Sequence, residues 1–260
     1  MSNTVLITGG SGGIGLCLAR EFAANGNDII LVSSSEDRLM RAKAELERDY
    51  DVSVSYIAAD LASHCGADEL YRKVSETGKT VDVLVNNAGF GDYAEFVESD
   101  WAKQERMVTL NVTTLMHLCH LFGAEMKKRG GGRILNIASC AAFVPGPYMS
   151  VYYASKAFVL SFSEALYEEL KEYGVYVTAL CLGPTTTGFT SAADMGKCTM
   201  FKKIKPDTPE AVAKTGYKAV MKGKAVKYHG MPTKLTNLGS RLAPRFLTRI
   251  SSKNINSKPE

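Results

Sequence analysis

Short apolar runs alternate with stretches of helical periodicity along most of the chain. The runs are apolar at both odd and even positions, as in strands buried on both faces, and they lie at 5–7, 29–32, 52–59, 81–85, 134–137 and 175–182. Between them, apolar residues recur every three or four positions and predict helices at 13–25, 39–46, 66–77, 101–128 and 152–172. This alternation predicts a single doubly wound α/β domain with a central parallel sheet flanked by helices.

The last part of the chain departs from this alternation. A helix is predicted near 209–221, and residues 231–250 combine an apolar stripe with Lys and Arg along another side. Pro244 interrupts that basic amphipathic pattern. We therefore divide the chain into a main domain at 1–225 and a basic amphipathic C-terminal extension at 226–260, which is either part of the same domain or an appended helix.

Composition excludes several classes of protein. Apolar residues make up 45% and charged residues 22% of the chain, which excludes a disordered chain, a collagen-like fibre and a small disulfide scaffold. The first five residues resemble no signal peptide, and no window approaches the roughly 18 consecutive apolar residues of a membrane-spanning helix. The six cysteines are scattered without a C-x-x-C spacing, which indicates reduced thiols. We expect a cytoplasmic protein.

Charge is divided unevenly along the sequence. From Lys202 onward there are 14 Lys or Arg and three Asp or Glu, whereas residues 1–201 hold 17 basic and 24 acidic residues. The basic tail indicates an anionic surface or ligand, or simply a solvated face. Its amphipathic helix has three possible places: over the substrate pocket, on another subunit, or in peripheral contact with an anionic membrane surface. Nucleic-acid binding is not expected, because no aromatic residues alternate with the basic ones.

A glycine-rich turn links the first predicted strand to the first predicted helix. Its sequence is Thr8-Gly9-Gly10-Ser11-Gly12-Gly13-Ile14-Gly15. Glycines let backbone N–H groups approach an anion, and the helix N-terminus adds a favourable dipole. After the first strand of an α/β sheet, such a turn predicts a dinucleotide site of the Rossmann type.

The end of the second strand bears on the choice of dinucleotide. A carboxylate there would bind the ribose hydroxyls and repel a 2′-phosphate, but Ser33, Ser34 and Ser35 precede the first acidic residue, Glu36. Arg38 follows one helical turn later. These residues favour NADP(H), with NAD(H) as the alternative. The serines are otherwise explained as the N-cap of the next helix.

A tyrosine and a lysine four residues apart begin a long predicted helix. Tyr152 and Lys156 share a helical face, whereas Tyr153 points elsewhere. A nearby ammonium favours the phenolate and would make the phenol a usable proton donor to a carbonyl. Ser139 lies at the carboxyl end of the fifth strand, where open α/β sheets bind ligands, and could bind the substrate oxygen. Asn111, a poor helix former within a helical pattern, could hold a water.

With these motifs the chain resembles the short-chain dehydrogenase/reductase family up to about residue 225. The cofactor turn T-G-x-x-x-G-x-G, the motif N-N-A-G at 86–89 and the catalytic set Asn111, Ser139, Tyr152 and Lys156 all match. The resemblance implies that Lys156 also holds the nicotinamide ribose and that Asn111 carries a water in a proton relay. The motifs and the resemblance together predict cofactor contacts from Gly9, Ser11, Gly13, Ile14, Gly15, Asp60, Leu61, Asn87, Ala88, Gly89, Tyr152, Lys156, Gly183, Thr185 and Thr187, in addition to Ser33, Ser34 and Arg38 at the end of the second strand.

Two positions depart from the family pattern. Cys140 stands where a second serine is frequent, and it could alter substrate contact or make the site oxidisable. Leu182 replaces the usual proline before Gly183, which leaves the course of the loop at 183–190 open.

The sequence gives less direct evidence on the substrate and on the oligomeric state. The candidate pocket residues are largely apolar and predict a lipophilic ketone or aldehyde; they are Phe143, Tyr148, Met149, Phe189, Met195, Met200 and Phe201. Family members commonly pair through the helices matching 101–128 and 152–172, which implies a homodimer or homotetramer.

No metal is expected, since His117, Cys119 and His120 have no further ligand cluster. The alternatives to an NADP(H)-dependent oxidoreductase are a non-catalytic dinucleotide sensor and a lipid-surface protein that uses only its basic tail.

Overall fold

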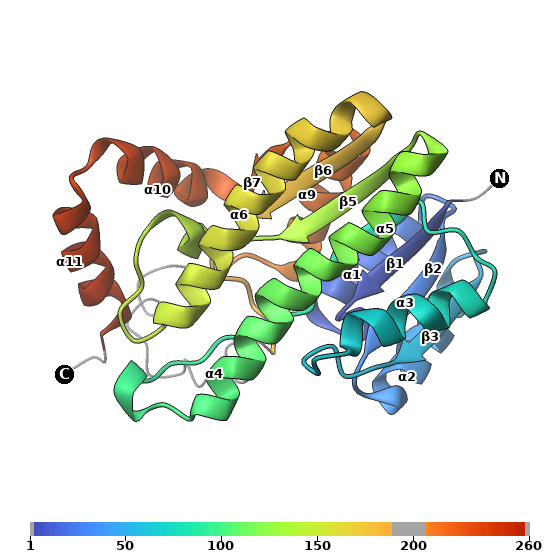
Figure 1. Ribbon diagram of the computed structural model, residues 1–260, viewed down its shortest axis with the longest axis horizontal. Coiled ribbons are helices and arrows are strands. Elements are labelled where there is room, and N and C mark those ends of the chain that lie inside the picture. The colour runs from blue at the N-terminus through green and yellow to red at the C-terminus, as the bar shows by residue number, and fades with distance from the viewer. Residues whose placement is uncertain (1–2, 189–205, 258–260) are drawn as a thin grey trace.

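A parallel β-sheet runs through the centre of the molecule (Figure 1). The computed structural model describes residues 3–188 and 206–257. Within them the strands are β1 (Thr4–Thr8), β2 (Asp28–Ser33), β3 (Val54–Ala58), β4 (Val83–Asn86), β5 (Gly132–Ile137), β6 (Val175–Cys181) and β7 (Val226–Tyr228). Their order is β3-β2-β1-β4-β5-β6-β7, and each neighbouring pair is parallel. The predicted doubly wound α/β fold is confirmed.

Helices cover both faces of the sheet. One face is covered by α1 (Gly13–Ala23), α2 (Glu36–Asp49) and α9 (Pro209–Met221). The other is covered by α3 (Gly66–Glu76), α5 (Leu115–Arg129) and α6 (Ser150–Leu170), and α4 (Trp101–Val108) packs on α6. Short turns of 3₁₀-helix lie at η1 (Phe96–Glu98), η3 (Cys140–Phe143) and η4 (Lys171–Tyr173). Because the strand order reverses between β1 and β4, a crevice opens at the carboxyl ends of these strands.

The segment predicted as one helix at 101–128 is interrupted in the structure. Between α4 and α5 the chain forms a π-helical turn, η2 (Thr109–Thr114), that contains Asn111. A π turn inserts one extra residue into the helical ladder, and such turns are frequent at functional sites. By length and composition the helix Trp101–Arg129 could cross a membrane, but half of its most apolar window is buried inside the protein.

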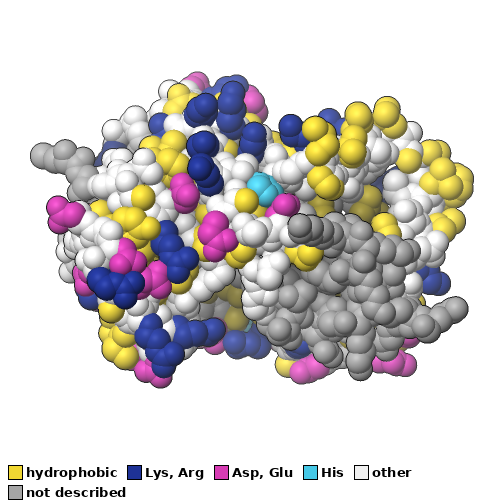
Figure 2. Space-filling view, turned by 180° about the vertical axis from the view of Figure 1, so that it is seen from behind, with side chains coloured by type: hydrophobic (Ala, Val, Ile, Leu, Met, Phe, Trp, Pro, Cys, Tyr) yellow, Lys and Arg dark blue, Asp and Glu magenta, His cyan; other side chains and the backbone are white. Residues whose placement is uncertain are grey.

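The C-terminal extension contains a strand and two helices. Strand β7 begins at residue 226, just past the boundary drawn at 225, and pairs with β6 in the main sheet. The amphipathic segment forms α10 (Gly230–Leu242) and α11 (Arg245–Asn256) instead of one interrupted helix. Pro244 is the N-cap residue of α11, where its missing N–H breaks no helical hydrogen bond. Figure 2 shows hydrophobic side chains gathered over these two helices.

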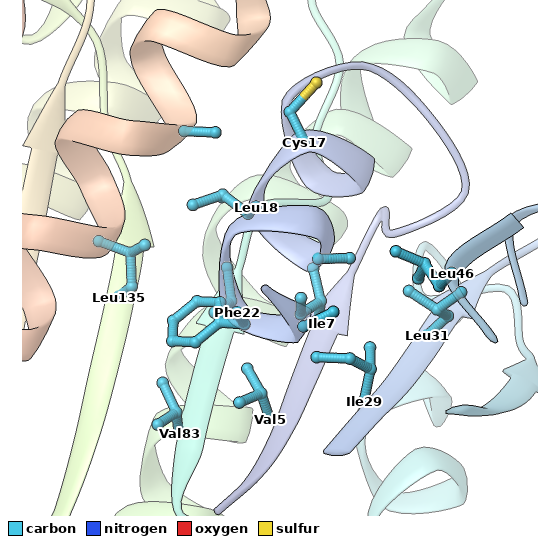
Figure 3. Packing of buried hydrophobic residues seen from close by; sticks show 14 of the residues in the cluster. Val5, Ile7, Cys17, Leu18, Phe22, Ile29, Leu31, Leu46, Val83 and Leu135 are labelled. Carbon is cyan, nitrogen blue, oxygen red and sulfur yellow. The ribbon is translucent and has the colours of Figure 1, made fainter. Parts of the chain in front are cut away.

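Close packing between α1 and the sheet fixes the position of the glycine turn (Figure 3). Leu18 and Phe22 of α1 are completely buried and pack in one cluster with Val5 and Ile7 of β1. Burial of a Leu or Phe side chain contributes roughly 1.5–3 kcal/mol. The start of α1 is thus held firmly above the carboxyl end of β1.

Candidate active site

The glycine turn between β1 and α1 brings two backbone segments unusually close. A Cβ atom on Gly15 would lie 2.2 Å from the Gly9 carbonyl oxygen and 2.6 Å from Asn87 Nδ2. Gly9 has φ +66°, and a Cβ there would lie 2.7 Å from the same Asn87 nitrogen. Any side chain at either glycine would therefore push the turn away from the end of β4.

Hydrogen bonds join this turn to the motif at 86–89. The Thr8 hydroxyl accepts from the backbone N–H groups of Asn87 and Ala88, each at 3.0 Å, and donates to the Val85 carbonyl. Asn87 Nδ2 donates to the carbonyls of Thr8 and Gly9. The carboxyl ends of β1 and β4 are thereby fixed relative to each other.

The turn has the features that a dinucleotide phosphate requires. Gly12 is the N-cap of α1, contributes no side-chain cap and has open space where a Cβ would project. Gly13 has φ +52°, a conformation that favours glycine. The first-turn N–H groups are therefore left for an anion at the positive end of the helix dipole. These residues fit the diphosphate of a nicotinamide dinucleotide.

The residues that we expect to bind the adenosine end of the dinucleotide line a cavity beside the glycine turn. Ser33, Ser34 and Arg38 border it, and Arg38 is exposed. Ser35 is the N-cap residue of α2 but makes no side-chain cap hydrogen bond, whereas the Ser33 hydroxyl accepts from the Ser35 N–H at 3.4 Å. Asp60, also on the border, accepts from the Ala62 N–H and pairs with Arg106 at 3.0 Å.

The phenol of Tyr152 and the hydroxyl of Ser139 meet at the carboxyl end of β5. Ser139 caps η3 by accepting from the Ala141 N–H at 3.1 Å, and its hydroxyl donates to the Leu182 carbonyl at 3.5 Å. Burial raises the pKa of Tyr152 above its ordinary value, although a hydrogen bond with Ser139 acts in the opposite direction. The neighbouring Tyr153 hydroxyl instead bonds Asn256 Oδ1 at 3.1 Å. The structure thus separates the two adjacent tyrosines as predicted.

Lys156 lies beneath Tyr152 and is almost completely buried. Its Nζ donates to the Ile137 carbonyl at 2.8 Å and lies 5.8 Å from the centre of the Tyr152 ring. Burial lowers the pKa of Lys156 to about 8, so the amine is mainly charged at neutral pH.

The sequence predicted that the Lys156 ammonium lowers the pKa of the Tyr152 phenol. For the side chains of the protein by themselves, this prediction is wrong. Lys156 is 5.8 Å from the ring centre and bonds a carbonyl, while burial is the dominant influence on the phenol. The pKa of Tyr152 is therefore raised rather than lowered. At neutral pH the phenol is protonated, which suits a proton donor.

Asn111 holds the loop after β4 against α6. Its Oδ1 accepts from the Phe90 N–H, and its Nδ2 donates to the Phe90 carbonyl at 2.9 Å and to Ser155 Oγ at 3.2 Å. A Cβ on Gly89 would lie 2.9 Å from Asn111 Oδ1. The side chain does not border the cavity, because its amide N–H groups bond protein atoms. The expected water-carrying role stays a prediction.

The loop after β6 closes the other side of the site. The Thr185 hydroxyl donates to the Gly183 carbonyl at 3.1 Å, and Thr185 forms an isolated parallel bridge with Asp207. Leu182, the residue in place of the family proline, accepts from the Cys140 N–H at 2.8 Å through its carbonyl. Burial raises the pKa of the Cys140 thiol, which disfavours the thiolate that oxidation needs.

One cavity of about 480 Å³ joins these groups. All of the predicted cofactor residues border it except Gly15, which lies beneath Gly9. Ser139, Tyr152 and Lys156 border it as well. The described part of the chain thus brings the phosphate turn and the acid–base groups to one site.

Of the predicted substrate-pocket residues that the structure describes, only one borders the cavity. Met149 borders the cavity, but Phe143 and Tyr148 do not. Phe143 packs against Tyr228 and Tyr148 against Tyr93, with ring centres 5.8 Å apart in both pairs. The four others, Phe189, Met195, Met200 and Phe201, lie outside the described residues.

Sequence reasoning missed several residues that support the site. Asn86 Nδ2 donates to Asn136 Oδ1 at 2.9 Å, and Asn136 Nδ2 donates to Ser163 Oγ at 2.9 Å. This buried chain joins β4, β5 and α6 below Tyr152. The polar Asn136 within an otherwise apolar run was the available signal.

The histidines and cysteine of α5 do not form a common site. His117 Nε2 is 3.5 Å from an Asp68 carboxylate oxygen, whereas Cys119 is buried beside Asn86 and Asn136. Within residues 3–188 and 206–257, no group of three or more His, Cys, Asp or Glu is arranged to hold a metal.

Comparison with known proteins places the chain in a family. The family model for short chain dehydrogenase matches residues 3–197. The very-long-chain 3-oxoacyl-CoA reductase of Bos taurus is 35% identical over 179 residues, covering 67% of this chain and 57% of that protein. The chain therefore spans little more than half the length of this curated relative.

Solved structures agree with this placement. The short-chain dehydrogenase from Sphingobium yanoikuyae in complex with NADPH has a TM-score of 0.83 at 30% identity, covering 92% of this chain and 93% of that one. The bulky-bulky ketone specific alcohol dehydrogenase from Comamonas testosteroni has a TM-score of 0.78 at 28% identity, with 92% of each chain covered. The chain belongs to the short-chain dehydrogenase family.

Proposed function

We propose that the protein transfers a hydride between NADP(H) and a lipophilic ketone or alcohol, with Tyr152 as the general acid or base. One observation carries this proposal. Ser139, Tyr152 and Lys156 border the same cavity as the glycine turn, so a carbonyl and a dinucleotide can be held together there. A non-catalytic sensor would need the turn but not the acid–base groups.

The chain's own groups have distinct parts in the reaction. The dinucleotide, when bound, supplies the hydride. The Ser139 hydroxyl holds the substrate oxygen, and the protonated Tyr152 phenol donates a proton to it during reduction. The Lys156 ammonium, fixed by the Ile137 carbonyl, is placed to hold the nicotinamide ribose of the bound dinucleotide.

Cofactor preference is inferred from the end of β2. Arg38 and the hydroxyls of Ser33 and Ser34 can bind a 2′-phosphate, and no carboxylate stands at the carboxyl end of β2 to oppose it. The relative from Sphingobium yanoikuyae is described in complex with NADPH, which supports the same preference.

A lipophilic substrate is supported by the cavity wall and by the relatives. Ala141, Met149 and Leu182 give the cavity an apolar border near Tyr152. The Comamonas enzyme is described as specific for bulky-bulky ketones, and the Bos taurus relative as a very-long-chain 3-oxoacyl-CoA reductase. We propose a bulky or long-chain carbonyl compound as the substrate class.

Replacing the proton donor tests the proposal. Tyr152→Phe should lower the rate of NADPH oxidation with a panel of hydrophobic ketones by at least about a hundredfold, since general acid catalysis contributes roughly 10²–10⁴-fold. The affinity for NADPH, measured by fluorescence titration, should change by only a few-fold.

The matched control is Tyr71→Phe on α3, whose phenol bonds Glu125 away from the cavity. It should keep the parental rate. Unchanged turnover in Tyr152→Phe would contradict its assignment, and NADPH binding without turnover of any ketone in the wild type would favour the sensor.

A further inference from the structure

The two C-terminal helices present their apolar side chains to solvent. Seven large apolar residues are each between 48% and 77% exposed: Met231, Leu235, Leu238, Leu242, Phe246, Leu247 and Ile250. We call this set the terminal apolar face. It occupies consecutive turns of α10 and α11, and Figure 2 shows hydrophobic side chains clustered there. A continuous apolar surface of this kind marks an interaction site.

The inner sides of the same helices are polar. Thr233 of α10 and Ser252 and Asn256 of α11 are buried against the body of the protein. A helix folded onto its own core shows the opposite arrangement, with apolar residues inside and polar residues outside. The sequence therefore directs the apolar side of both helices toward something beyond the described part of the chain.

The charge around this face is of one sign. Residues 211–259 contain eleven Lys or Arg and no Asp or Glu. Five of these cations, all exposed, lie on the two helices: Lys234, Arg241, Arg245, Arg249 and Lys253. Within the described ranges none of them makes an ion pair. The surface is thus apolar and cationic together.

The length of the helices restricts how they can meet a membrane. They have 13 and 12 residues and are separated at Pro244, whereas a spanning helix needs about 20 apolar residues. Short helices with an apolar side and flanking cations lie in the plane of the interface and bind anionic lipids. We propose that the terminal apolar face docks the protein peripherally on an anionic lipid bilayer.

A second copy of the chain is a poorer partner for this face. A closed two-fold contact would place the same patch on both sides, so the cations of one copy would meet those of the other. Docking of the patch onto the acidic body of another copy would be head-to-tail, which produces rings or open filaments. Charge complementarity therefore favours the lipid surface.

The two helices that carry the terminal apolar face pack beside the cavity. Helix α10 packs on η3, whose Cys140 and Ala141 border the cavity, and Asn256 of α11 bonds Tyr153 on its wall. Delivery of a lipophilic substrate from the bilayer would rest on the proposed function, but docking itself does not. A binding measurement therefore tests docking even if the proposed reaction is wrong.

Co-sedimentation of the full chain with lipid vesicles is the direct test. Vesicles of phosphatidylcholine with about one third phosphatidylglycerol should sediment the protein at low salt, while vesicles of phosphatidylcholine alone should bind it much more weakly. Raised salt should weaken the binding, because the Debye length shortens. Absence of binding to anionic vesicles at low salt would overturn the proposal.

Substitutions locate the binding face. The double variant Leu242→Glu with Phe246→Glu should weaken vesicle binding by at least about tenfold, because two apolar side chains no longer insert. Arg245→Gln should weaken it roughly fivefold. The matched controls are Met40→Glu, an exposed methionine on α2, and Lys128→Gln on α5, and both should bind as the wild type does.

Other outcomes assign the face differently. Unchanged vesicle binding by the double variant would overturn the proposal, as would an equal loss in Met40→Glu. If the double variant instead changes the oligomeric mass by light scattering and leaves vesicle binding unaffected, the face belongs to a second copy. Circular dichroism and thermal unfolding should match the wild type, because the replaced side chains are 77% and 54% exposed.

Discussion

At the residue scale, burial decides the protonation of the acid–base pair. Lys156 is 6% exposed and Tyr152 is partly buried, and burial raises the pKa of the phenol and lowers that of the amine to about 8. Each shift favours the neutral form. The neutral phenol is the form that the proposed proton donation requires, and the amine is still mainly charged at pH 7.

The shifted lysine gives stability a distinct pH dependence. The unfolded chain holds the Lys156 proton up to pH of about 10.4, while the folded protein releases it near 8. Between these values the unfolded state binds more protons, so this residue increases stability as pH rises. The raised pKa of Tyr152 acts in the opposite sense only above pH of about 10.

Comparison with Lys156→Met isolates this contribution. Relative to the variant, the wild type should gain free energy of unfolding from pH 7.5 to about pH 10. Chemical denaturation across that range measures the difference. A difference that stays constant, or that falls with pH, would contradict the lowered lysine pKa.

Arg38 determines the expected cofactor preference. Arg38→Ala should raise the KM for NADPH by about tenfold or more, because a charge-assisted hydrogen bond contributes roughly 1.5–3 kcal/mol, and leave the KM for NADH nearly unchanged. Arg41→Ala, on the same helix but away from the cavity border, is the matched control. An equal effect of Arg38→Ala on both cofactors would contradict recognition of the 2′-phosphate.

The residues that sequence could predict share a local pattern. The spacing of Tyr152 and Lys156 is set by one helical turn, and the glycine turn is contiguous. By contrast, the contact of Asn111 with Phe90 and Ser155 depends on a π turn, which no local sequence pattern predicted. Burial, which sets the direction of the Tyr152 pKa, is a tertiary property and was misjudged for that reason.

At the element scale, α11 is anchored at its C-terminal end. Asn256 is fully buried: its Oδ1 accepts from Tyr153, its Nδ2 donates to the Pro147 carbonyl at 3.1 Å, and its carbonyl accepts from Tyr93 at 2.5 Å. These partners lie on the opening of α6 and on the loops beside it. A side chain more than 100 positions distant therefore positions the segment that carries Tyr152.

Removing this amide should loosen α11. Asn256→Ala is expected to lower the free energy of unfolding by about 1–3 kcal/mol and to speed tryptic cleavage at Arg245, Arg249 or Lys253. Urea denaturation and limited proteolysis measure the two effects. Asn254→Ala, an exposed position on the same helix, serves as the control; equal sensitivity of both variants would exclude an anchoring role for Asn256.

Helices and strands could be predicted from the sequence where the hydrophobic periodicity was strong and the element was long enough to show it. The first six strands and the helices between them follow from alternation of buried runs with helical patterns. Strand β7 has three residues, each only half-buried, and so gave no apolar run. The division of the final segment into α10 and α11 follows from Pro244, which the sequence showed as an interruption without fixing the angle between the helices.

At the scale of the whole molecule, chemistry and surface contact are separated along the chain. The glycine turn, the proposed catalytic residues and the acidic excess belong to residues 1–201, and the cationic, outward-apolar helices belong to the end. The two parts meet where α10 packs on η3 and α11 bonds Tyr153. The exposed apolar side chains of α10 and α11 are therefore distinct from the residues that border the cavity.

The π turn η2 makes the number of residues between α4 and α5 important. Deleting one residue between 109 and 114 would restore an ordinary α-helix and rotate α4 by roughly 100° about its axis relative to α5. Lys103 and Gln104, which now bond the Asp92 carboxylate, would be carried away from it. The chain can therefore exchange many side chains along this helix, but it cannot readily lose a single position there.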